Sequence, residues 1–313
     1  MTSRRVLVEA PPYPIEVVTD LLAPAGVSAA ALPRPWSGDD VVGLLVWHPV
    51  SAADMQRLPG LKVIATCSVG FDHIDVAAAE RRGVWVCNVP DYCVDEMADS
   101  TLALLLALLR GVVTLDRSVR SGAWDVYAAG PLARLRGTRL GVIGFGRIGR
   151  AVALRALALG MEVWATDPVV ASKEISASGV RPAALDELLA SCTAVTLHVR
   201  LTEHTRGLIS ERKLALMGRG SFLVNTARSG LVDADALLAA LDRGHLGGAA
   251  VDVIPIEPPT PQHPAPRHPR LIVTPHAGWY SPDSEREVYR RATLAVRAVL
   301  EGRAPEGSVV RPS

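Results

Sequence analysis

The stretch GVIGFGRIGR, Gly141 to Arg150, joins an apolar, strand-like run to the helical pattern AVALRALALG. Gly144, Gly146 and Gly149 stand in GxGxxG spacing at this junction. In a dinucleotide site the first glycine allows a tight turn, the second lets the backbone approach a pyrophosphate, and the third lets helix and strand pack closely. The phosphates lie at the positive end of the helix dipole. The stretch therefore predicts a dinucleotide-binding turn, with a glycine turn that binds nothing as the alternative.

The following strand-like run indicates which dinucleotide is bound. MEVWAT leads into Asp167, one strand beyond the glycines. A carboxylate at this place accepts hydrogen bonds from the adenosine ribose hydroxyls and repels a 2′-phosphate. No arginine follows at once, because the next residues are Pro168, Val169 and Val170. The sequence predicts NAD rather than NADP.

Strand-like runs alternate with helical stretches along the whole chain, which argues for an α/β fold with parallel sheets. One series of strands precedes the apolar stretch ADSTLALLLALLRGV and a second begins at the glycine turn. We expect a Rossmann dinucleotide-binding domain over residues 99–280. Residues 1–98 plus 281–313 are expected to form a smaller flavodoxin-like substrate domain, also with a parallel sheet. After the helical run SEREVYRRATLAVRAVLEG the chain ends in a short polar tail, and residues 255–270, rich in proline, predict a surface loop without regular structure.

Composition excludes several classes of function. The 313 residues carry a formal net charge of +1 and few aromatic side chains, so no basic face predicts nucleic acid or an anionic membrane as a partner. The longest apolar run, residues 102–109, is too short to span a bilayer and predicts a buried helix. The cysteines form no CxxC pair, and the histidines do not cluster with them, which favours reduced thiols in a cytoplasm and no metal. They are Cys67, Cys87, Cys93 and Cys192.

Three polar residues follow successive strands of the second series: Arg228 in VNTARSG, Glu257 in DVIPIEPP and His276 in TPHAGWY. Ligands of an open α/β sheet bind beyond the carboxyl ends of its strands, so these residues are expected to face the cofactor. The guanidinium fork of Arg228 suits a carboxylate and an adjacent carbonyl oxygen. His276 can give or take a proton near neutral pH, and a hydrogen bond from its ring to Glu257 would orient it and favour the imidazolium form.

Each of the three residues has a structural alternative. An arginine after a strand is commonly a surface ion pair, a glutamate in a proline-rich loop is commonly solvated, and a single histidine is commonly not catalytic. Their joint position around a dinucleotide fold favours the catalytic hypothesis, in which His276 is the acid and base.

The chain resembles the D-isomer-specific 2-hydroxy acid dehydrogenases over nearly its whole length. The matching motifs are CSVGFDHID, CNVP, DEMADSTLALLLALLR, GVIGFGRIG, LHVRLTEHTRGLI, VNTARSGLVD, GGAAVDVIPIEPP and TPHAGWYS. The motifs GFDHID, AVALRALALG and PHAGWYS look most like the branch of the C-terminal-binding proteins, which are NADH-dependent corepressors. The resemblance implies a homodimer joined through the NAD-binding domains and the catalytic set Arg228, Glu257 and His276. A glutamine replaces this glutamate in the related formate dehydrogenases, so Glu257 speaks against formate.

The same resemblance implies the binding residues. The backbone amides of Val69 and Gly70 would hold the substrate carboxylate. Trp279 would line the substrate pocket, with interface packing as its alternative, and Trp47 and His48 are further candidates. Cofactor contacts are implied for Gly144, Gly146, Arg147, Ile148, Gly149, Asp167, His198, Thr205, Thr226, Ala227 and Asp252, although Asp252 has a structural role at its strand end as an alternative.

Three residues depart from the family pattern without removing a catalytic group. Arg200 stands where many members have proline, Met97 replaces a smaller residue near the cofactor, and Ser229 replaces the usual glycine. The sequence thus predicts hydride transfer between NAD and a small 2-oxo or D-2-hydroxy acid. An NADH-responsive interaction protein of the corepressor type, and a dehydrogenase for a phosphonate or another acid analogue, stay open as alternatives.

Overall fold

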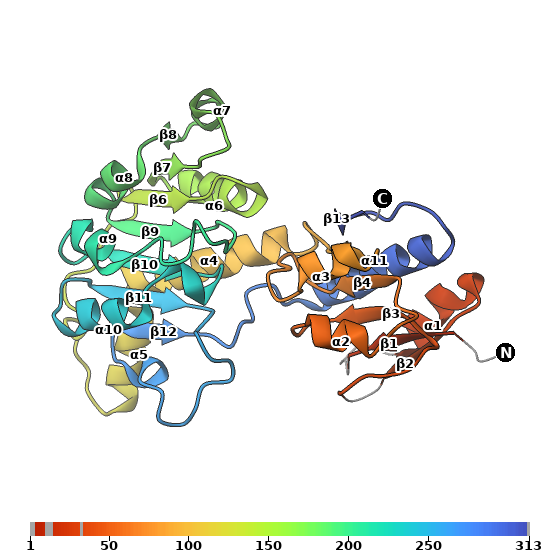
Figure 1. The fold of residues 1–313 in the computed structure, drawn as a ribbon. Helices are drawn as coiled ribbons and strands as arrows, with labels where there is room; N and C mark the ends of the chain where they lie inside the picture. Colours follow the sequence, from red (N-terminus) through yellow and green to blue (C-terminus); the bar gives the residue numbers. More distant parts are fainter. Residues whose placement is uncertain (1–3, 10–14, 32–33, 312–313) are drawn as a thin grey trace. The chain divides into compact units, whose positions relative to one another are not determined.

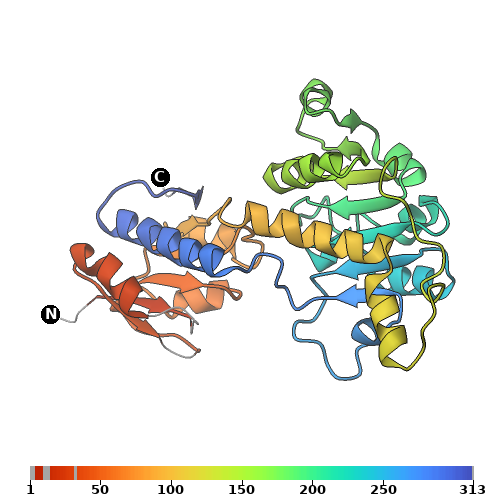
Figure 2. The same cartoon turned by 180° about the vertical axis from the view of Figure 1, so that it is seen from behind.

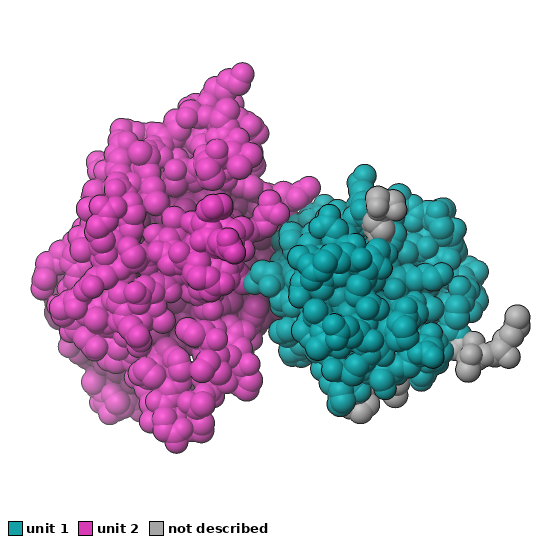
Figure 3. Space-filling view, viewed as in Figure 1, with its two compact units in different colours: residues 1–92, 280–313 teal, residues 93–279 magenta. Residues whose placement is uncertain are grey.

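The computed structural model describes residues 4–9, 15–31 and 34–311. The chain divides into two compact units, which Figure 3 colours separately. Unit 1 is Met1–Tyr92 with Tyr280–Ser313, and unit 2 is Cys93–Trp279.

Unit 1 is built on a six-stranded sheet with the order β13-β5-β4-β3-β1-β2 (Figure 1). The order β2-β1-β3-β4-β5 is that of flavodoxin-like folds. All residues of β3, the run VVGLLV, are buried, as expected for a central strand covered on both faces. The strands are β1 (Arg5–Val8), β2 (Ser28–Ala31), β3 (Val41–Val46), β4 (Val63–Thr66), β5 (Trp85–Cys87) and β13 (Ser308–Val310).

Helices cover both faces of the unit 1 sheet. Alternate strand residues pack against α1 (Ile15–Leu22) and the long helix α11 (Pro282–Leu300) on one face. On the other face they pack against α2 (Ala52–Gln56) and α3 (Val76–Arg81). Figure 2 shows α11 lying along the sheet beside α1. This helix starts with a capping box, in which Ser281 and Ser284 each accept the other's backbone N–H.

Unit 2 holds a seven-stranded parallel sheet with the order β12-β11-β10-β9-β6-β7-β8. Counted from β6, this is the Rossmann order, and the direction of strand succession reverses between β6 and β9. The strands are β6 (Arg139–Ile143), β7 (Glu162–Thr166), β8 (Arg181–Pro182), β9 (Ala194–Leu197), β10 (Phe222–Asn225), β11 (Gly248–Val251) and β12 (Leu271–Val273).

Two groups of helices cover the unit 2 sheet. One face packs against α4 (Val94–Leu109), α6 (Arg147–Ala158) and α7 (Ser172–Ala177). The other packs against α8 (Leu185–Ser191), α9 (Glu211–Leu216) and α10 (Ala234–Asp242). A further helix, α5 (Val112–Arg120), has no buried residue.

The boundaries of the units differ from the expected domains at residues 98 and 280. The first division falls before α4 rather than inside it, because α4 is one continuous helix from Val94. Ala98, Leu102 and Leu105 of this helix belong to a hydrophobic core of unit 2. Tyr280 falls in unit 1, next to the cap of α11.

Two details of the expected fold were wrong, and one strand was not predicted. The sheet of unit 1 is not purely parallel, because β13 lies in the supposed polar tail and pairs antiparallel with β5. The strand β2 is an alanine-rich run without the β-branched residues that mark a strand. The proline-rich segment contains a 3₁₀ turn, η3 (Ala265–Arg267), whose Ala265 is buried against the core.

Within the described ranges, no helix is by itself both long and apolar enough to cross a membrane. The helices α4 and α5 reach such a length only as a pair, and they are bent by 61° relative to each other.

Candidate active site

The glycine turn between β6 and α6 combines two closely packed glycines with one that faces open space. A Cβ on Gly144, whose φ is +95°, would come within 2.7 Å of the carbonyl of His198, and a Cβ on Gly149 would come within 2.0 Å of the Gly144 oxygen. A Cβ on Gly146 would meet nothing within 4 Å. Gly146 is also the N-cap of α6 and provides no capping side chain. The turn therefore leaves an uncovered cradle at a helix N-terminus, where anions bind.

The two residues after Gly146 differ in exposure. Arg147 is exposed, and within the described part of the chain it has no hydrogen-bond or ion-pair partner. Ile148 is half-buried and packs on the hydrophobic core beneath α6. Arg147 therefore presents a free positive charge beside the cradle.

Asp167, at the end of β7, is tied to the glycine turn. Its Oδ2 accepts the N–H of Phe145 at 2.7 Å, and its Oδ1 accepts those of Val169 and Val170 at 2.8 and 3.1 Å. Burial by itself would raise the pKa of Asp167, but these hydrogen bonds, with a smaller contribution from Arg150, lower it below the ordinary value. Asp167 is thus an anion that orders the turn, and about one of its four lone pairs is left to accept a further hydrogen bond.

The loop after β9 holds the next two predicted cofactor residues. His198 is hydrogen-bonded through Nε2 to Thr196 Oγ1 at 3.1 Å, and burial lowers its pKa to about 3, so the ring is neutral. The hydroxyl of Thr205 donates to the carbonyl of Arg200 at 2.6 Å and accepts the N–H of Thr202 at 2.8 Å. Thr205 therefore closes this loop, while the side chain of Arg200 is exposed.

At the end of β10 the buried residue Asn225 shapes the segment that carries Arg228. Its Nδ2 donates to the Arg228 carbonyl at 2.8 Å, and its Oδ1 accepts the Ala227 N–H at 3.0 Å. Thr226 is buried with its hydroxyl bonded to that of Thr101 at 2.8 Å. Asn225 was not predicted from the sequence as part of the site. The signal that could have indicated it is a polar residue at the end of an apolar strand.

Glu257 and His276 form a pair. His276 Nδ1 lies 2.8 Å from Glu257 Oε2, and the N–H of Ile254 donates to Oε1 at 2.9 Å. Burial would raise the pKa of Glu257, but its bonds from His276 and Ile254 and the nearby charge of Arg228 lower it overall. A carboxylate only accepts, so Nδ1 carries a proton and Nε2 is left for other chemistry. The hydrogen bond predicted between these residues is present.

Asp252, at the end of β11, holds the loop that presents His276. Its Oδ1 accepts from Thr274 Oγ1 at 2.5 Å and from the Ala277 N–H at 2.9 Å, and its Oδ2 accepts the Gly278 N–H at 2.8 Å. His276 has a φ of 55°, the one positive value among non-glycine residues in the described ranges. Such a conformation costs about 1–3 kcal/mol and persists only where the surroundings hold it. These contacts agree with a structural role for Asp252 at the end of its strand, which the sequence left open as an alternative to a cofactor contact.

The catalytic candidates line one open hollow of about 240 Å³. Arg228, Glu257 and His276 come from the ends of β10, β11 and β12, which are neighbouring parallel strands. The rest of the hollow is lined by Ser229, Val253, Ile254 and Pro255. A cationic fork, a carboxylate and an imidazole thus share one small space at the carboxyl edge of the sheet.

The chain as a whole is similar in sequence to known proteins. Residues 102–278 match the family described as "D-isomer specific 2-hydroxyacid dehydrogenase, NAD binding domain". The chain is 35% identical over 283 residues to a glyoxylate reductase of Thermofilum pendens, covering 86% of this chain and 81% of the relative. It is 36% identical over 262 residues to a glycerate dehydrogenase of Methylorubrum extorquens, covering 82% and 81%. The chain belongs to the D-isomer specific 2-hydroxyacid dehydrogenase family.

The fold agrees over the full length with a solved member. The crystal structure of a D-lactate dehydrogenase from Aquifex aeolicus, complexed with NAD and lactic acid, matches with a TM-score of 0.88 and 28% identity. The match covers 99% of this chain and all of that one. The family assigns an NAD-binding domain to unit 2, and the open cradle at Gly146, the free charge of Arg147 and the acidic Asp167 all fit that dinucleotide.

Other predicted site residues of this dehydrogenase lie elsewhere in the chain. Val69 and Gly70 follow β4 in unit 1 and are half-buried. Trp279 is the half-buried last residue of unit 2. In unit 2, Ser100 Oγ donates to the Gly278 carbonyl at 3.1 Å, and the Sδ of Met97 lies against Gly278. Met97, which departs from the family pattern, thus packs on the loop that carries His276.

Proposed function

We propose that this protein interconverts a small 2-oxo acid and its D-2-hydroxy acid, with His276 as the proton donor and acceptor. The observation that supports this most directly is the hollow of about 240 Å³ that Arg228, Glu257 and His276 share. Its size suits an acid of a few heavy atoms. Bound NADH supplies the hydride in the direction of reduction.

Arg228 is proposed to bind and orient the acid. A planar guanidinium can donate two parallel hydrogen bonds, which suits the carboxylate and the neighbouring carbonyl oxygen. Its Nη1 donates to the Ala227 carbonyl at 2.9 Å, a contact that restricts the side chain. The side chain thereby polarises the carbonyl and holds its carbon in one place, and positioning of this kind lowers a barrier substantially.

His276 is proposed to deliver a proton from Nε2 to the carbonyl oxygen during reduction and to remove it during oxidation. Glu257 fixes the orientation of the ring through its contact with Nδ1. Proton transfer by a positioned group contributes about 10²–10⁴-fold to a rate. The strained backbone of His276, held by Asp252, directs the ring into the hollow.

The preferred substrates are proposed to be short, polar 2-oxo acids. The two relatives are named for glyoxylate and for glycerate, whose 2-oxo form is hydroxypyruvate. A phosphonate or another acid analogue would present the same kind of anion to Arg228 and belongs in the same test.

A panel of 2-oxo acids and analogues, assayed with NADH by absorbance of the reduced cofactor, tests this function. We expect oxidation of NADH with glyoxylate or hydroxypyruvate, and little with formate in the reverse assay with NAD. Tight NADH binding without turnover of any acid would contradict the proposal and favour the interaction-protein alternative of the corepressor branch.

The protein is further proposed to be a homodimer joined through unit 2. The helix α5 buries none of its residues, and the segment after it exposes large apolar side chains. Trp124 is 91% exposed and Tyr127 81%. Apolar surface of this kind usually marks an interface. Light scattering should give twice the chain mass for the wild type and a smaller mass for Trp124→Glu, and a monomeric wild type would refute the dimer.

A further inference from the structure

Two turns lie side by side at the carboxyl edge of the unit 1 sheet. The strands β3 and β4 are parallel neighbours, with Val46 paired to Thr66, and the N–H of Cys67 donates to the Val46 carbonyl at 2.8 Å. Residues 47–49 therefore follow β3 next to residues 68–70, which follow β4. The two turns differ in which of their peptide groups, N–H or C=O, are hydrogen-bonded within the protein.

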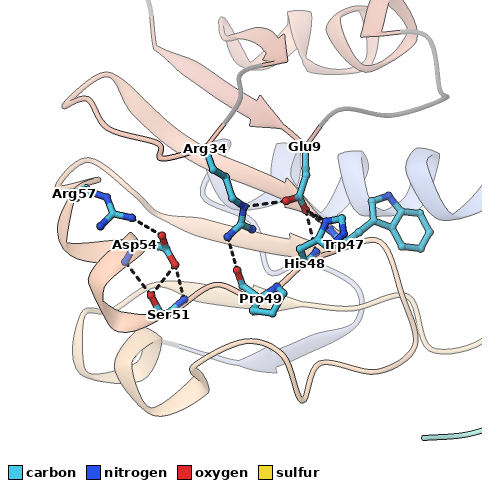
Figure 4. Close-up of polar contacts among 8 residues, drawn as sticks. All are labelled: Glu9, Arg34, Trp47, His48, Pro49, Ser51, Asp54 and Arg57. Atoms are coloured by element: carbon cyan, nitrogen blue, oxygen red, sulfur yellow. Dashed lines mark hydrogen bonds and ion pairs between the residues drawn. The ribbon is translucent and has the colours of Figure 1, made fainter. Parts of the chain in front are cut away.

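In the turn after β3, the amides are used by the protein. Glu9 Oε2 accepts the N–H groups of Trp47 at 2.8 Å and His48 at 2.9 Å. Arg34 binds Glu9 Oε1 at 2.9 Å and donates to the Pro49 carbonyl at 2.6 Å, as Figure 4 shows. Burial would raise the pKa of Glu9, but these amides and the nearby cations lower it, so the carboxylate is charged. The N–H groups of this turn are therefore already bound to an anion, the carboxylate of Glu9.

In the turn after β4, the carbonyls are used instead. The Ser68 carbonyl accepts the N–H of Val89 at 3.1 Å, and the Val69 carbonyl accepts from Asn88 Nδ2 at 2.6 Å. The Gly70 carbonyl accepts from the Ser68 hydroxyl at 2.5 Å. Within the described ranges, the N–H groups of Val69 and Gly70 have no acceptor in the protein.

The hydrogen bonds to the Ser68 and Val69 carbonyls also determine where the N–H groups of Val69 and Gly70 point. The C=O and N–H of one trans peptide point in opposite directions. The bond from Asn88 to the Val69 carbonyl therefore aims the Gly70 N–H away from residues 88 and 89, and the Val89 bond to Ser68 does the same for the Val69 N–H. Asn88 is itself anchored, because its own N–H donates to the Gly307 carbonyl at 3.0 Å.

We propose that Asn88 is a positioning residue for substrate: it holds the Val69–Gly70 peptide so that two adjacent amides face a carboxylate. This inference rests on the proposed function and on the expectation, from the family resemblance, that those amides bind the carboxylate of the acid. Successive N–H groups in a turn form a site for anions. Asn88 touches neither substrate nor cofactor in this role, and its side chain acts through the Val69 carbonyl alone.

Two variants test the role of Asn88. Asn88→Ala removes the donor, and Asn88→Asp keeps the shape but puts a carboxylate oxygen where the donor was, which repels the Val69 carbonyl. The readouts are kcat and KM for glyoxylate, the inhibition constant of oxamate as a non-reducible analogue, and the Kd of NADH. Ser51→Ala is the matched control, because it removes the side-chain cap of α2 near the neighbouring turn.

For Asn88→Ala we expect KM and the oxamate constant to rise about 10-fold, since one hydrogen bond to a charged group loses its orientation. The aspartate variant should show a larger rise, while kcat and NADH affinity stay within about threefold of the wild type because Arg228 and His276 are unaltered. Equal KM and oxamate values in both Asn88 variants and Ser51→Ala would overturn the proposal.

Failure of the proposed function is separable from failure of this inference. If the wild type turns over no acid, calorimetry of oxamate with the NADH-loaded protein replaces kinetics. Oxamate binding that Asn88→Asp abolishes would then support the role of Asn88 although the reaction is wrong. Absence of oxamate binding to the wild type would overturn both.

Discussion

The two units of this dehydrogenase carry their proposed chemistry in different parts of the chain. Unit 2 uses side chains, since Arg228, Glu257 and His276 line the hollow at the ends of β10 to β12. Unit 1 uses backbone, since the turn after β4 offers the N–H groups of Val69 and Gly70. Most substitutions can delete the first kind of group but can only misdirect the second, because among the amino acids only proline lacks the backbone N–H.

The comparison shows which neighbouring groups must hold the functional groups of each unit in place. The unit 2 residues depend on neighbours that fix rotamers and loops, as Glu257 fixes the ring of His276 and Asp252 fixes its loop. The unit 1 amides depend on groups that hold the opposite side of each peptide, such as Asn88. Variants of the two units should therefore fail in different kinetic parameters.

The largest effect is expected from His276→Ala. Loss of the proton donor should lower kcat by about 10²–10⁴-fold, and NADH affinity should change little because the cradle at Gly146 is untouched. Stopped-flow turnover and NADH fluorescence titration measure the two quantities. His268→Ala, which removes an imidazole paired with Asp242 in the same unit, is the control. Turnover near that of the wild type would remove His276 from the reaction.

Arg228→Lys should have the next largest effect. Lysine keeps the charge but loses the paired donors, so KM for the acid should rise about 10- to 100-fold. Steady-state kinetics at saturating NADH would show it. An unchanged KM would mean that Arg228 does not hold the carboxylate, and the role given to the side chains of unit 2 would have to be revised.

Gly146 allows the backbone of unit 2 to be tested like that of unit 1. Its φ of −74° and ψ of −162° suit alanine, and the added Cβ meets no protein atom, so Gly146→Ala should fold normally. The Cβ would occupy the cradle, and NADH should bind about 10-fold more weakly. Gly149→Ala is the contrasting variant, because its Cβ clashes with the Gly144 oxygen, and it should lower the melting temperature instead. Undiminished NADH binding by Gly146→Ala would argue against the cradle.

Glu9→Gln sharpens the contrast between the two turns of unit 1. The pKa of Glu9 is lowered below its ordinary value of 4.5, so its stabilisation is complete above that pH and is lost as pH falls through the lowered pKa. The variant should be less stable than the wild type by about 1–2 kcal/mol near pH 7, with the difference shrinking in acid. Urea unfolding across the pH range measures this. A constant difference down to the acid end would show that Glu9 is not the titrating group.

Much of the fold could be predicted from the sequence because it rests on local patterns. The alternation of buried strands and helices predicted both α/β units, and the glycine spacing predicted the Rossmann turn. The strands β2 and β13 were missed because SAAA and SVV have weak strand signals and are stabilised by neighbours far along the chain. The boundary at residue 98 was misplaced since sequence cannot show which core a continuous apolar helix joins.

The candidate site could be predicted only in part. That Arg228, Glu257 and His276 lie together could be predicted, because their side-chain types suit one reaction and they follow successive strands. Asn225 and Asn88 were not predicted, because an asparagine in a sequence does not show which carbonyl it will hold. The branch of the C-terminal-binding proteins, suggested by GFDHID and PHAGWYS, stays a prediction.

The sequence by itself determined the class of fold, the dinucleotide turn and the kinds of reactive group, because these follow from residue types and short spacings. Only the tertiary structure decided that Asp252 ties down the loop of His276, and that the amides after β4 are open while those after β3 are closed by Glu9. Hydrogen bonds between residues distant in the chain have no local signature, since the direction of a peptide group depends on which partner folding brings to it.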